Sequence, residues 1–172
     1  MRRNFLPILG LLSLFVLGSC SADRDPKIAS LKHAVEVADS QLLDAAAELD
    51  TTNCFPRSLM PKFRAVDAKD WTSGFFPGSL WQCYRFTGDE KLLAEAWKYT
   101  DRLEGIQYYK GTHDLGFMVF CSFGQQMETL HDQHSEEVIV EAAKSLISRC
   151  DPRIGLIRSW DFGEWNYPVI ID

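Results

Sequence analysis

Positive charge is scarce in this chain, and its scarcity excludes one large class of partners. The 172 residues include 18 Lys and Arg against 24 Asp and Glu, which gives a formal net charge of −6. A protein that binds nucleic acid needs an excess of basic residues to meet the phosphates. We therefore expect no nucleic acid among its partners. The length is sufficient for one domain with one sizeable core.

Closely spaced cysteines and β-strand patterns are also missing. After Cys20 the cysteines are far apart, at Cys54, Cys83, Cys121 and Cys150, and they form no CxxC pair. A metal site therefore has little support. An even number of cysteines would permit disulfides in an exported protein, but we expect free, buried thiols. Because no coherent alternation of apolar and polar residues occurs, we predict an all-α fold.

Long apolar runs are confined to the N-terminus. Phe5 to Leu17 is apolar and follows Arg2 and Arg3. This run is too short to span a bilayer comfortably, and its charged flank is typical of a signal peptide. Both observations predict that the protein is exported.

The end of this run resembles a bacterial lipobox, with Leu17-Gly18-Ser19-Cys20 at the expected cleavage point. In that motif the Cys thiol is lipidated, so we expect residues 1–20 to be a lipoprotein signal peptide. An ordinary secretory signal with a chance Cys is the alternative. Residues 21–26 would then form a tether, and the protein would be membrane-anchored in the periplasm or on the cell surface.

Helical periodicity covers most of the remaining chain. A helix is predicted from Pro26, because apolar residues recur at helical spacing. Phe55–Ala68 is predicted to be irregular. An apolar helix, a short turn and an amphipathic helix then occur around Gly78–Leu103 and again around Gly116–Ile147. A helical hairpin repeated at roughly 45 residues predicts a toroid with its functional residues on the loops.

Two details of the second repeat are open to direct test. We expect Phe117–Leu130 to be one helix with an apolar first half. Ser135 is a candidate N-cap for the following helix, because Glu136 and Glu137 come next and favour a helix N-terminus.

Asp114 is the strongest candidate for a chemical role. The stretch Gly111-Thr112-His113-Asp114-Leu115-Gly116-Phe117 places a carboxylate beside an imidazole, just before an apolar run. Charged residues are rarely buried without a partner or a task. Asp114 is equally explicable as a helix N-cap. His113 alone is more often a hydrogen-bonded structural residue.

Two aromatic segments accompany this loop. Asp70-Trp71-Thr72-Ser73-Gly74-Phe75-Phe76-Pro77-Gly78 is rich in glycine and aromatic residues, and we expect Asp70 to brace it. Trp71 is either a core residue or a wall of a pocket. The final segment carries Trp160 and Trp165, which is typical of a loop that crosses a cleft.

Together, three segments in order resemble the unsaturated glucuronyl hydrolases, glycoside hydrolase family 88. They are Asp70–Gly78, Thr112–Phe117 and the terminal Pro168-Val169-Ile170-Ile171-Asp172. The resemblance implies an (α/α)6 barrel built from six helical hairpins. Such a barrel needs about twice this length, so we expect residues 27–172 to be the N-terminal part of the domain, an incomplete barrel with about half of its helices. The sequence given is then expected to be truncated and inactive alone.

The resemblance also implies a reaction. Members of this family release a Δ4,5-unsaturated uronic acid from lyase-generated oligosaccharides by adding water across a vinyl ether bond, without a metal or an organic cofactor. By motif match, Asp172 corresponds to the general acid/base and Asp114 to the second essential carboxylate. His113 and Trp71 match positions around the sugar. Trp160 or Trp165 would supply another wall, and the sequence does not choose between them.

Two other functions fit the same residues. One is a carbohydrate-binding surface lipoprotein without catalysis, in which the aromatic loops alone hold the sugar. The other is a conventional glycosidase that uses two carboxylates on the same barrel.

Overall fold

The structure, a computed structural model, describes residues 25–58 and 62–170. Helices dominate these residues, and four short strands accompany them. In chain order the elements are α1 (Pro26–Glu48), β1 (Phe55–Ser58), β2 (Arg64–Val66), α2 (Phe75–Thr87), α3 (Glu90–Asp101), η2 (Ile106–Tyr108), α4 (Leu115–Phe120), α5 (Phe123–Leu130), α6 (Gln133–Ile147), β3 (Cys150–Asp151) and β4 (Leu156–Ile157).

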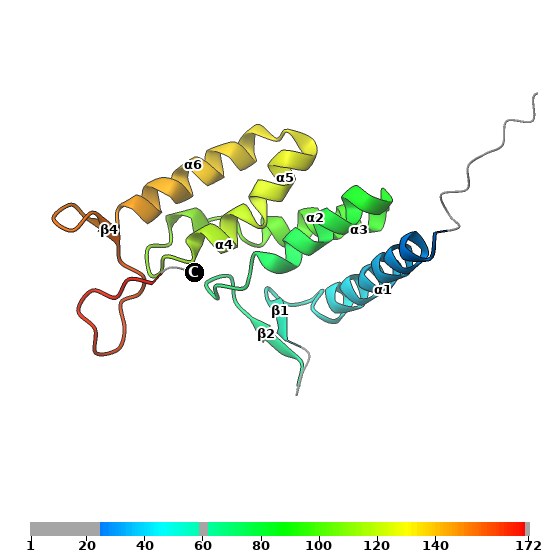
Figure 1. The fold of residues 1–172 in the computed structure, drawn as a ribbon, viewed down its shortest axis with the longest axis horizontal. Coiled ribbons are helices and arrows are strands. Elements are labelled where there is room, and N and C mark those ends of the chain that lie inside the picture. The colour runs from blue at the N-terminus through cyan, green and yellow to red at the C-terminus, as the bar shows by residue number, and fades with distance from the viewer. Residues whose placement is uncertain (1–24, 59–61, 171–172) are drawn as a thin grey trace, which may run out of the picture.

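Two helical hairpins form the body of the molecule. α2 packs against α3, and α6 packs along α4, α5 and the short helix η2 (Figure 1). The hairpins meet where α5 contacts α2 and α3, while α1 contacts the α2–α3 pair. The β3–β4 hairpin and the loop after it extend from the end of α6 (Figure 1). The predicted pattern of repeated helical hairpins is therefore present.

Local chemistry explains the turn of the first hairpin. Gly88 ends α2 in the left-handed conformation, with φ at 70°, which glycine adopts without a steric penalty. Asp89 then begins α3, because its side chain accepts a 2.8 Å hydrogen bond from the main-chain N–H of Lys91. The short turn predicted between the two helices of Gly78–Leu103 is confirmed, and it lies at Gly88 and Asp89.

The core lies between the two hairpins. Trp81 of α2 is fully buried, and its indole N–H donates a 2.9 Å hydrogen bond to the hydroxyl of Thr100 on α3. This bond satisfies the polar atom of a large apolar side chain, as buried tryptophans require. The apolar face of α3 is also fully buried, through Leu92, Ala96 and Tyr99, and Leu103 just after the helix is buried with them.

Two predictions about the second hairpin are wrong. The helix expected over Phe117–Leu130 is broken at Cys121 and Ser122 into α4 and α5. The Ser122 hydroxyl donates a 2.6 Å hydrogen bond back to the carbonyl of Met118, and such back-bonding competes with a regular helix. Ser135 is not an N-cap, because Asp132 caps α6 and accepts a 2.8 Å bond from the Ser135 main-chain N–H.

Short β-structure was not expected, yet two small antiparallel pairs occur. β1 pairs with β2, and β3 pairs with β4. The first pair lies in the segment predicted to be irregular. Phe55 explains its presence, since its side chain is fully buried and its ring packs edge-on against that of Tyr99.

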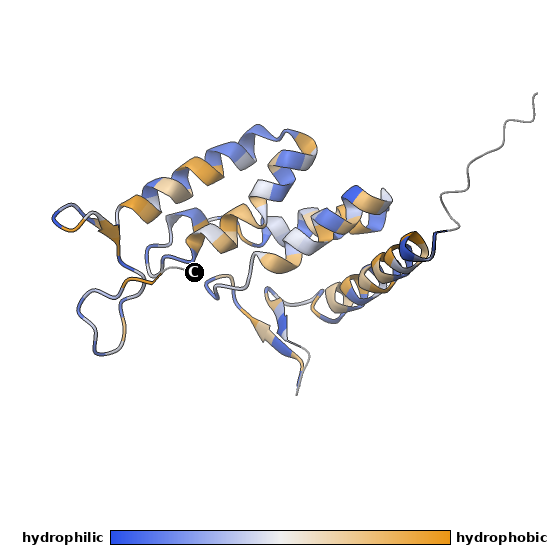
Figure 2. Ribbon diagram, in the orientation of Figure 1, coloured by the Kyte–Doolittle hydropathy of each residue, from blue (hydrophilic) through white to orange (hydrophobic). Residues whose placement is uncertain are grey.

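Apolar residues occur along every helix (Figure 2), and some of their side chains are exposed. Leu31 and Val37 on α1, Phe86 on α2 and Phe120 on α4 are exposed, so these helices are not enclosed on every side. Within the described residues, no helix combines the length and the apolar character that crossing a membrane requires. The four cysteines among these residues are free thiols, but they are half-buried and not fully buried as expected.

Candidate functional site

The loop before α4 holds Asp114 in a fixed position. The Thr112 hydroxyl donates a 2.6 Å hydrogen bond to Oδ2 of Asp114, and it accepts a 3.2 Å bond from the Asp114 main-chain N–H. On the other side, Oδ1 of Asp114 lies 3.3 Å from Nε2 of His113. The His113 and Asp114 side chains are 17% and 23% exposed, so both are largely withdrawn from water without being sealed from it.

Asp114 also stands at the N-terminus of α4, but its side chain does not cap the helix. No capping bond from this carboxylate to α4 is formed among the described residues, and the helix begins instead on the Asp114 main-chain carbonyl. Asp114 is therefore the N-cap residue of α4 by position, but its carboxylate makes no capping bond to the helix. The Asp114 carboxylate instead contacts Thr112 and His113, and it is not used to satisfy the end of the helix.

The final segment of the chain returns to this loop. Trp160 and Thr112 form an isolated antiparallel bridge, and the His113 main-chain N–H donates a 2.8 Å hydrogen bond to the carbonyl of Ser159. The rings of His113 and Trp160 meet edge-on, with centroids 6.5 Å apart. Trp160 in turn stacks on Phe162 at 5.7 Å.

Trp71 contacts α4 through Phe117. Its ring meets Phe117 of α4 at 6.1 Å and Phe75 of α2 at 5.9 Å, and it is 43% exposed. Arg57 lies 5.9 Å from the Trp71 ring centroid and donates a 2.6 Å hydrogen bond to Asp70. Phe117 follows Asp114 by about one helical turn, so Trp71 contacts α4 close to the end at which Asp114 begins the helix.

Asp70 braces the loop that carries Trp71, as predicted. One carboxylate oxygen accepts bonds from the main-chain N–H and the hydroxyl of Thr72, at 3.0 and 2.6 Å. The other accepts the bond from Arg57. The turn is closed by the buried Ser73, whose hydroxyl donates to the carbonyl of Ala68.

Two glycines allow this loop to approach α4. A Cβ on Gly74 would lie 2.3 Å from the carbonyl oxygens of Phe117 and Met118. A Cβ on Gly78 would lie 2.2 Å from the carbonyl oxygen of Cys121. Main chain therefore packs on main chain between α2 and α4, which brings Trp71 beside Phe117.

The remaining predicted residues are placed differently. Trp165 lies in the loop after β4 and is 68% exposed, so of the two tryptophans it is Trp160 that contacts His113. Cys20 and Asp172 lie outside the described residues. Within residues 25–58 and 62–170, no three His, Cys, Asp or Glu side chains are grouped closely enough to hold a metal ion.

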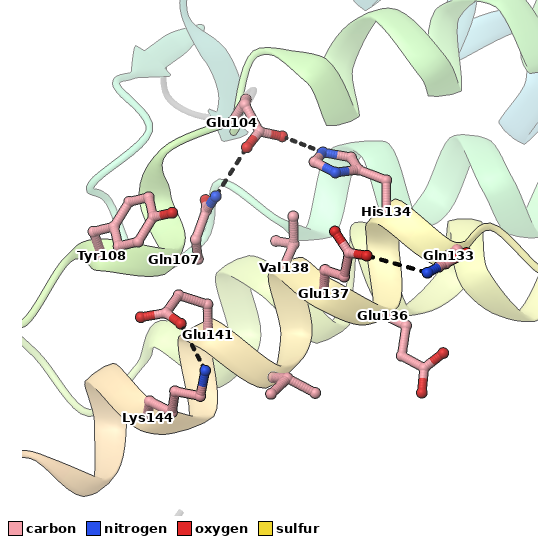
Figure 3. Close-up of a pocket in the computed structure, with 11 residues that line it drawn as sticks. Glu104, Gln107, Tyr108, Gln133, His134, Glu136, Glu137, Val138, Glu141 and Lys144 are labelled. Carbon is pink, nitrogen blue, oxygen red and sulfur yellow. Dashed lines mark hydrogen bonds and ion pairs between the residues drawn. The ribbon is translucent and has the colours of Figure 1, made fainter.

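A separate cavity of about 550 Å³ lies between η2 and α6 (Figure 3). The residues lining it include Glu104, His134 and Glu137 but not Asp114. Glu104 receives a 2.8 Å hydrogen bond from Gln107 and lies 2.9 Å from Nε2 of His134 (Figure 3). Within the part of the chain that the structure describes, the lining of this cavity includes no residue of the segments Asp70–Gly78, Thr112–Phe117 or Pro168–Asp172.

Sequence reasoning did not assign roles to Thr112 and Ser159. Thr112 carries a local signal, since a Thr two residues before an Asp often bonds to it or to its main chain. Ser159 carries no such signal, because its partners are His113 and Ile170, far away in sequence.

Similarity to known proteins is extensive over this part of the chain. An unsaturated glucuronyl hydrolase from Formosa agariphila is 46% identical over 126 residues, which cover 70% of this chain and 32% of that protein. An unsaturated chondroitin disaccharide hydrolase from Streptococcus pyogenes is 32% identical over 118 residues, covering 64% of this chain and 29% of that protein. No family model matches the sequence.

Solved structures show the same likeness. The crystal structure of an unsaturated glucuronyl hydrolase specific for heparin superposes with a TM-score of 0.69 at 39% identity, covering 79% of this chain and 38% of that one. The chain thus spans about a third of the length of the curated relatives it matches. The solved relatives are (α/α)6 barrels, and the helical hairpins described here form part of such a barrel.

Proposed function

The chain belongs to the unsaturated glucuronyl hydrolase family over the part that it spans, and from this we propose that the protein is a glycoside hydrolase. Its substrate would be an oligosaccharide that ends in a Δ4,5-unsaturated uronic acid. The observation that supports the proposal most strongly is the 46% identity to the Formosa agariphila protein, which is named an unsaturated glucuronyl hydrolase.

The proposed reaction is hydration of the vinyl ether. A carboxylic acid protonates C4, and the oxygen of a water molecule bonds to C5. One proton of this water stays on the new C5 hydroxyl, and the other passes to the carboxylate. The hemiketal at C5 then opens to a ketone, which leaves a hemiacetal at C1 that releases the neighbouring sugar. Asp172 is assigned the proton transfers by motif match.

Asp114 would assist this step electrostatically. Positive charge develops on the ring when C4 is protonated, and a nearby carboxylate stabilises that charge. The contacts that support this role are those from Thr112 and His113, which fix the orientation of Asp114 before the substrate arrives. Pre-organised groups of this kind lose little free energy to reorganisation during the reaction.

Aromatic rings would hold the sugar. Trp71 is partly exposed and contacts Phe117 of α4, and Trp160 is partly exposed and contacts His113. Apolar C–H faces of a sugar pack on such rings, and the contact also excludes water from the reacting atoms. His113, between Asp114 and Trp160, is assigned a contact with a substrate hydroxyl.

A comparison of unsaturated and saturated substrates tests the proposal. The protein, in the full form that its gene encodes, is given an unsaturated chondroitin or heparin disaccharide and the matching saturated disaccharide. Hydration predicts loss of the double-bond absorbance together with release of one neighbouring sugar per double bond lost. Turnover of the saturated substrate would instead support a conventional glycosidase, and binding without product would support a carbohydrate-binding role.

We also propose export and a lipid anchor at Cys20. The support is the lipobox-like sequence Leu17-Gly18-Ser19-Cys20 after the apolar run. Metabolic labelling with a radioactive fatty acid should mark the wild-type protein but not Cys20→Ala. Equal labelling of the two proteins would refute the anchor.

A further inference from the structure

Ser159 joins two segments that are far apart in sequence. It is fully buried. Its carbonyl accepts a 2.8 Å hydrogen bond from the His113 main-chain N–H. Its hydroxyl oxygen accepts a 3.0 Å bond from the Ile170 main-chain N–H, and its own N–H donates a 2.8 Å bond to the carbonyl of Pro168. One residue therefore binds the His113–Asp114 loop on one side and the segment of Pro168 to Ile170 on the other.

Both segments lead directly to a carboxylate of the proposed reaction. Asp114 is the next residue after His113. Asp172 follows Ile170 by two residues, and two residues of chain span at most about 7.6 Å between Cα atoms. The position at which the chain enters this last stretch is therefore set by the bond between Ile170 and the Ser159 hydroxyl.

The aromatic loop between the two contacts closes at the same place. Residues 160–167 leave from Ser159 and return at Pro168, so the Ser159–Pro168 bond is the neck of this loop. Tyr167 fastens its returning end, because the phenol oxygen lies 2.9 Å from the Asp151 N–H and 2.7 Å from the Leu156 carbonyl. The loop that carries Trp160 is thus independently anchored to the β3–β4 hairpin.

We propose that Ser159 is a positioning residue that holds the Pro168–Ile170 segment in a fixed place against the His113–Asp114 loop. This inference rests on the function proposed above. Ser159 acts through main-chain N–H groups and does not touch the substrate. The hydroxyl is the part of Ser159 that a substitution can remove while the two main-chain bonds remain. Its loss should let the Ile170 segment shift relative to Asp114, and a misplacement of about 1 Å can cost on the order of 100-fold in rate.

A buried serine of purely structural value would behave differently. Its loss would lower the melting temperature, but the folded enzyme would turn over at the normal rate. A positioning role predicts instead a fall in kcat of about 10- to 100-fold for Ser159→Ala, with KM changed by less than about threefold. KM is spared because Trp71, Trp160 and His113 still bind the sugar.

A matched control separates the two explanations. Ser135 is also fully buried, and its hydroxyl donates a 2.8 Å hydrogen bond to Asp132 at the start of α6. Ser135→Ala removes the same group from a comparable environment away from Asp114. It should lower the melting temperature by a similar amount and leave kcat within about twofold of wild type.

The experiment measures kcat, KM and Ile170 amide hydrogen exchange for wild type, Ser159→Ala and Ser135→Ala of the full protein. Faster Ile170 exchange and a low kcat in Ser159→Ala alone would support the inference. An active wild type with unchanged kcat in Ser159→Ala would overturn the positioning role and leave the proposed function intact. A wild type without turnover would overturn both. If Ser159→Ala does not fold, Ser159→Cys decides, because its thiol is a weaker acceptor of similar size and predicts the same fall in smaller measure.

Discussion

Gly74 lies directly against the main chain of Met118, so closely that a Cβ on Gly74 would come within 2.3 Å of the Met118 carbonyl oxygen. Gly74 belongs to the loop that carries Trp71, and Met118 belongs to the helix that Asp114 begins. The contact therefore helps to determine how close the loop that carries Trp71 lies to the helix that Asp114 begins. Because only glycine fits at position 74, the packing of α2 on α4 and the position of the Trp71 loop depend on this residue.

Gly74→Ala should destabilise the protein and impair it. A methyl group at this position meets main-chain oxygens that cannot rotate away, and overpacking of this kind costs about 1–3 kcal/mol in the free energy of unfolding. Displacement of the Trp71 loop should also raise KM. Denaturant unfolding and steady-state kinetics measure the two effects.

Gly116→Ala is the matched control for that substitution. Apart from its chain neighbours and the backbone of α4 itself, a Cβ on Gly116 would meet no atom of the described residues within 4 Å, and the φ of Gly116 is not positive. Because alanine favours a helix over glycine by about 1 kcal/mol, this variant should be as stable as wild type or slightly more stable. Equal destabilisation by Gly74→Ala and Gly116→Ala would show that the close packing of α2 on α4 is unimportant.

Asp114→Asn should remove most of the activity. The amide has nearly the same shape as the carboxylate, but it carries no negative charge to stabilise a cationic ring. We expect kcat to fall by about 10²–10⁴-fold, with an unchanged melting temperature. Asp89→Asn is the control, since asparagine caps a helix as well as aspartate and Asp89 lies at the start of α3. A fully active Asp114→Asn enzyme would remove Asp114 from the mechanism.

Thr112→Val should weaken catalysis without abolishing it. The substitution removes the hydroxyl that donates a 2.6 Å bond to Asp114 and leaves the shape of the side chain nearly unchanged. A hydrogen bond to a charged group contributes about 1.5–3 kcal/mol, so kcat should fall by at least about tenfold. Thr112→Ser restores the hydroxyl and should restore the rate. If Val and Ser have the same kcat, the hydroxyl does not position Asp114.

The His134–Glu104 pair predicts a pH dependence of stability at the cavity in Figure 3. The hydrogen bond with Glu104 raises the pKa of His134 above its ordinary 6.5, with further contributions from the charges of Asp132 and Glu137. Burial acts to raise the pKa of Glu104, but the hydrogen bonds from His134 and Gln107 outweigh it, so that this pKa lies below its ordinary 4.5.

The His134–Glu104 pair stabilises the fold over a limited pH range. The contribution of His134 is fully present below about pH 6.5 and is lost as the pH rises through its raised pKa. The contribution of Glu104 is present above about pH 4.5 and is lost as the pH falls through its lowered pKa. His134→Gln should therefore be less stable than wild type by about 0.2–1 kcal/mol near pH 5.5, and the difference should vanish near pH 9. A constant difference across this range would contradict the ion pair.

The extent to which the sequence predicts the fold depends on the range of the interactions. Helical periodicity predicts α3 correctly because the buried side chains of Leu92, Ala96 and Tyr99 recur along one face of the element itself. The break between α4 and α5 was missed because its causes are a back-bond from Ser122 and the approach of Gly78 from another helix. Neither cause leaves a strong trace in the local pattern of apolar residues.

The same distinction applies to the site. The adjacency of His113 and Asp114 is covalent, so the sequence shows it directly. Whether Trp160 or Trp165 accompanies them depends on the bridge between Thr112 and Trp160, which joins residues 48 apart. Sequence alone left that choice open, and the structure places Trp160 against His113.

Deuterium incorporation during the reaction tests the central claim most directly. The full protein is supplied with an unsaturated uronyl disaccharide in D₂O, and the uronate product is examined by NMR spectroscopy and mass spectrometry. Hydration through protonation of carbon predicts one deuterium at C4, introduced on a single face, together with loss of the double-bond absorbance. Release of the neighbouring sugar with the double bond intact and no deuterium at C4 would contradict the account.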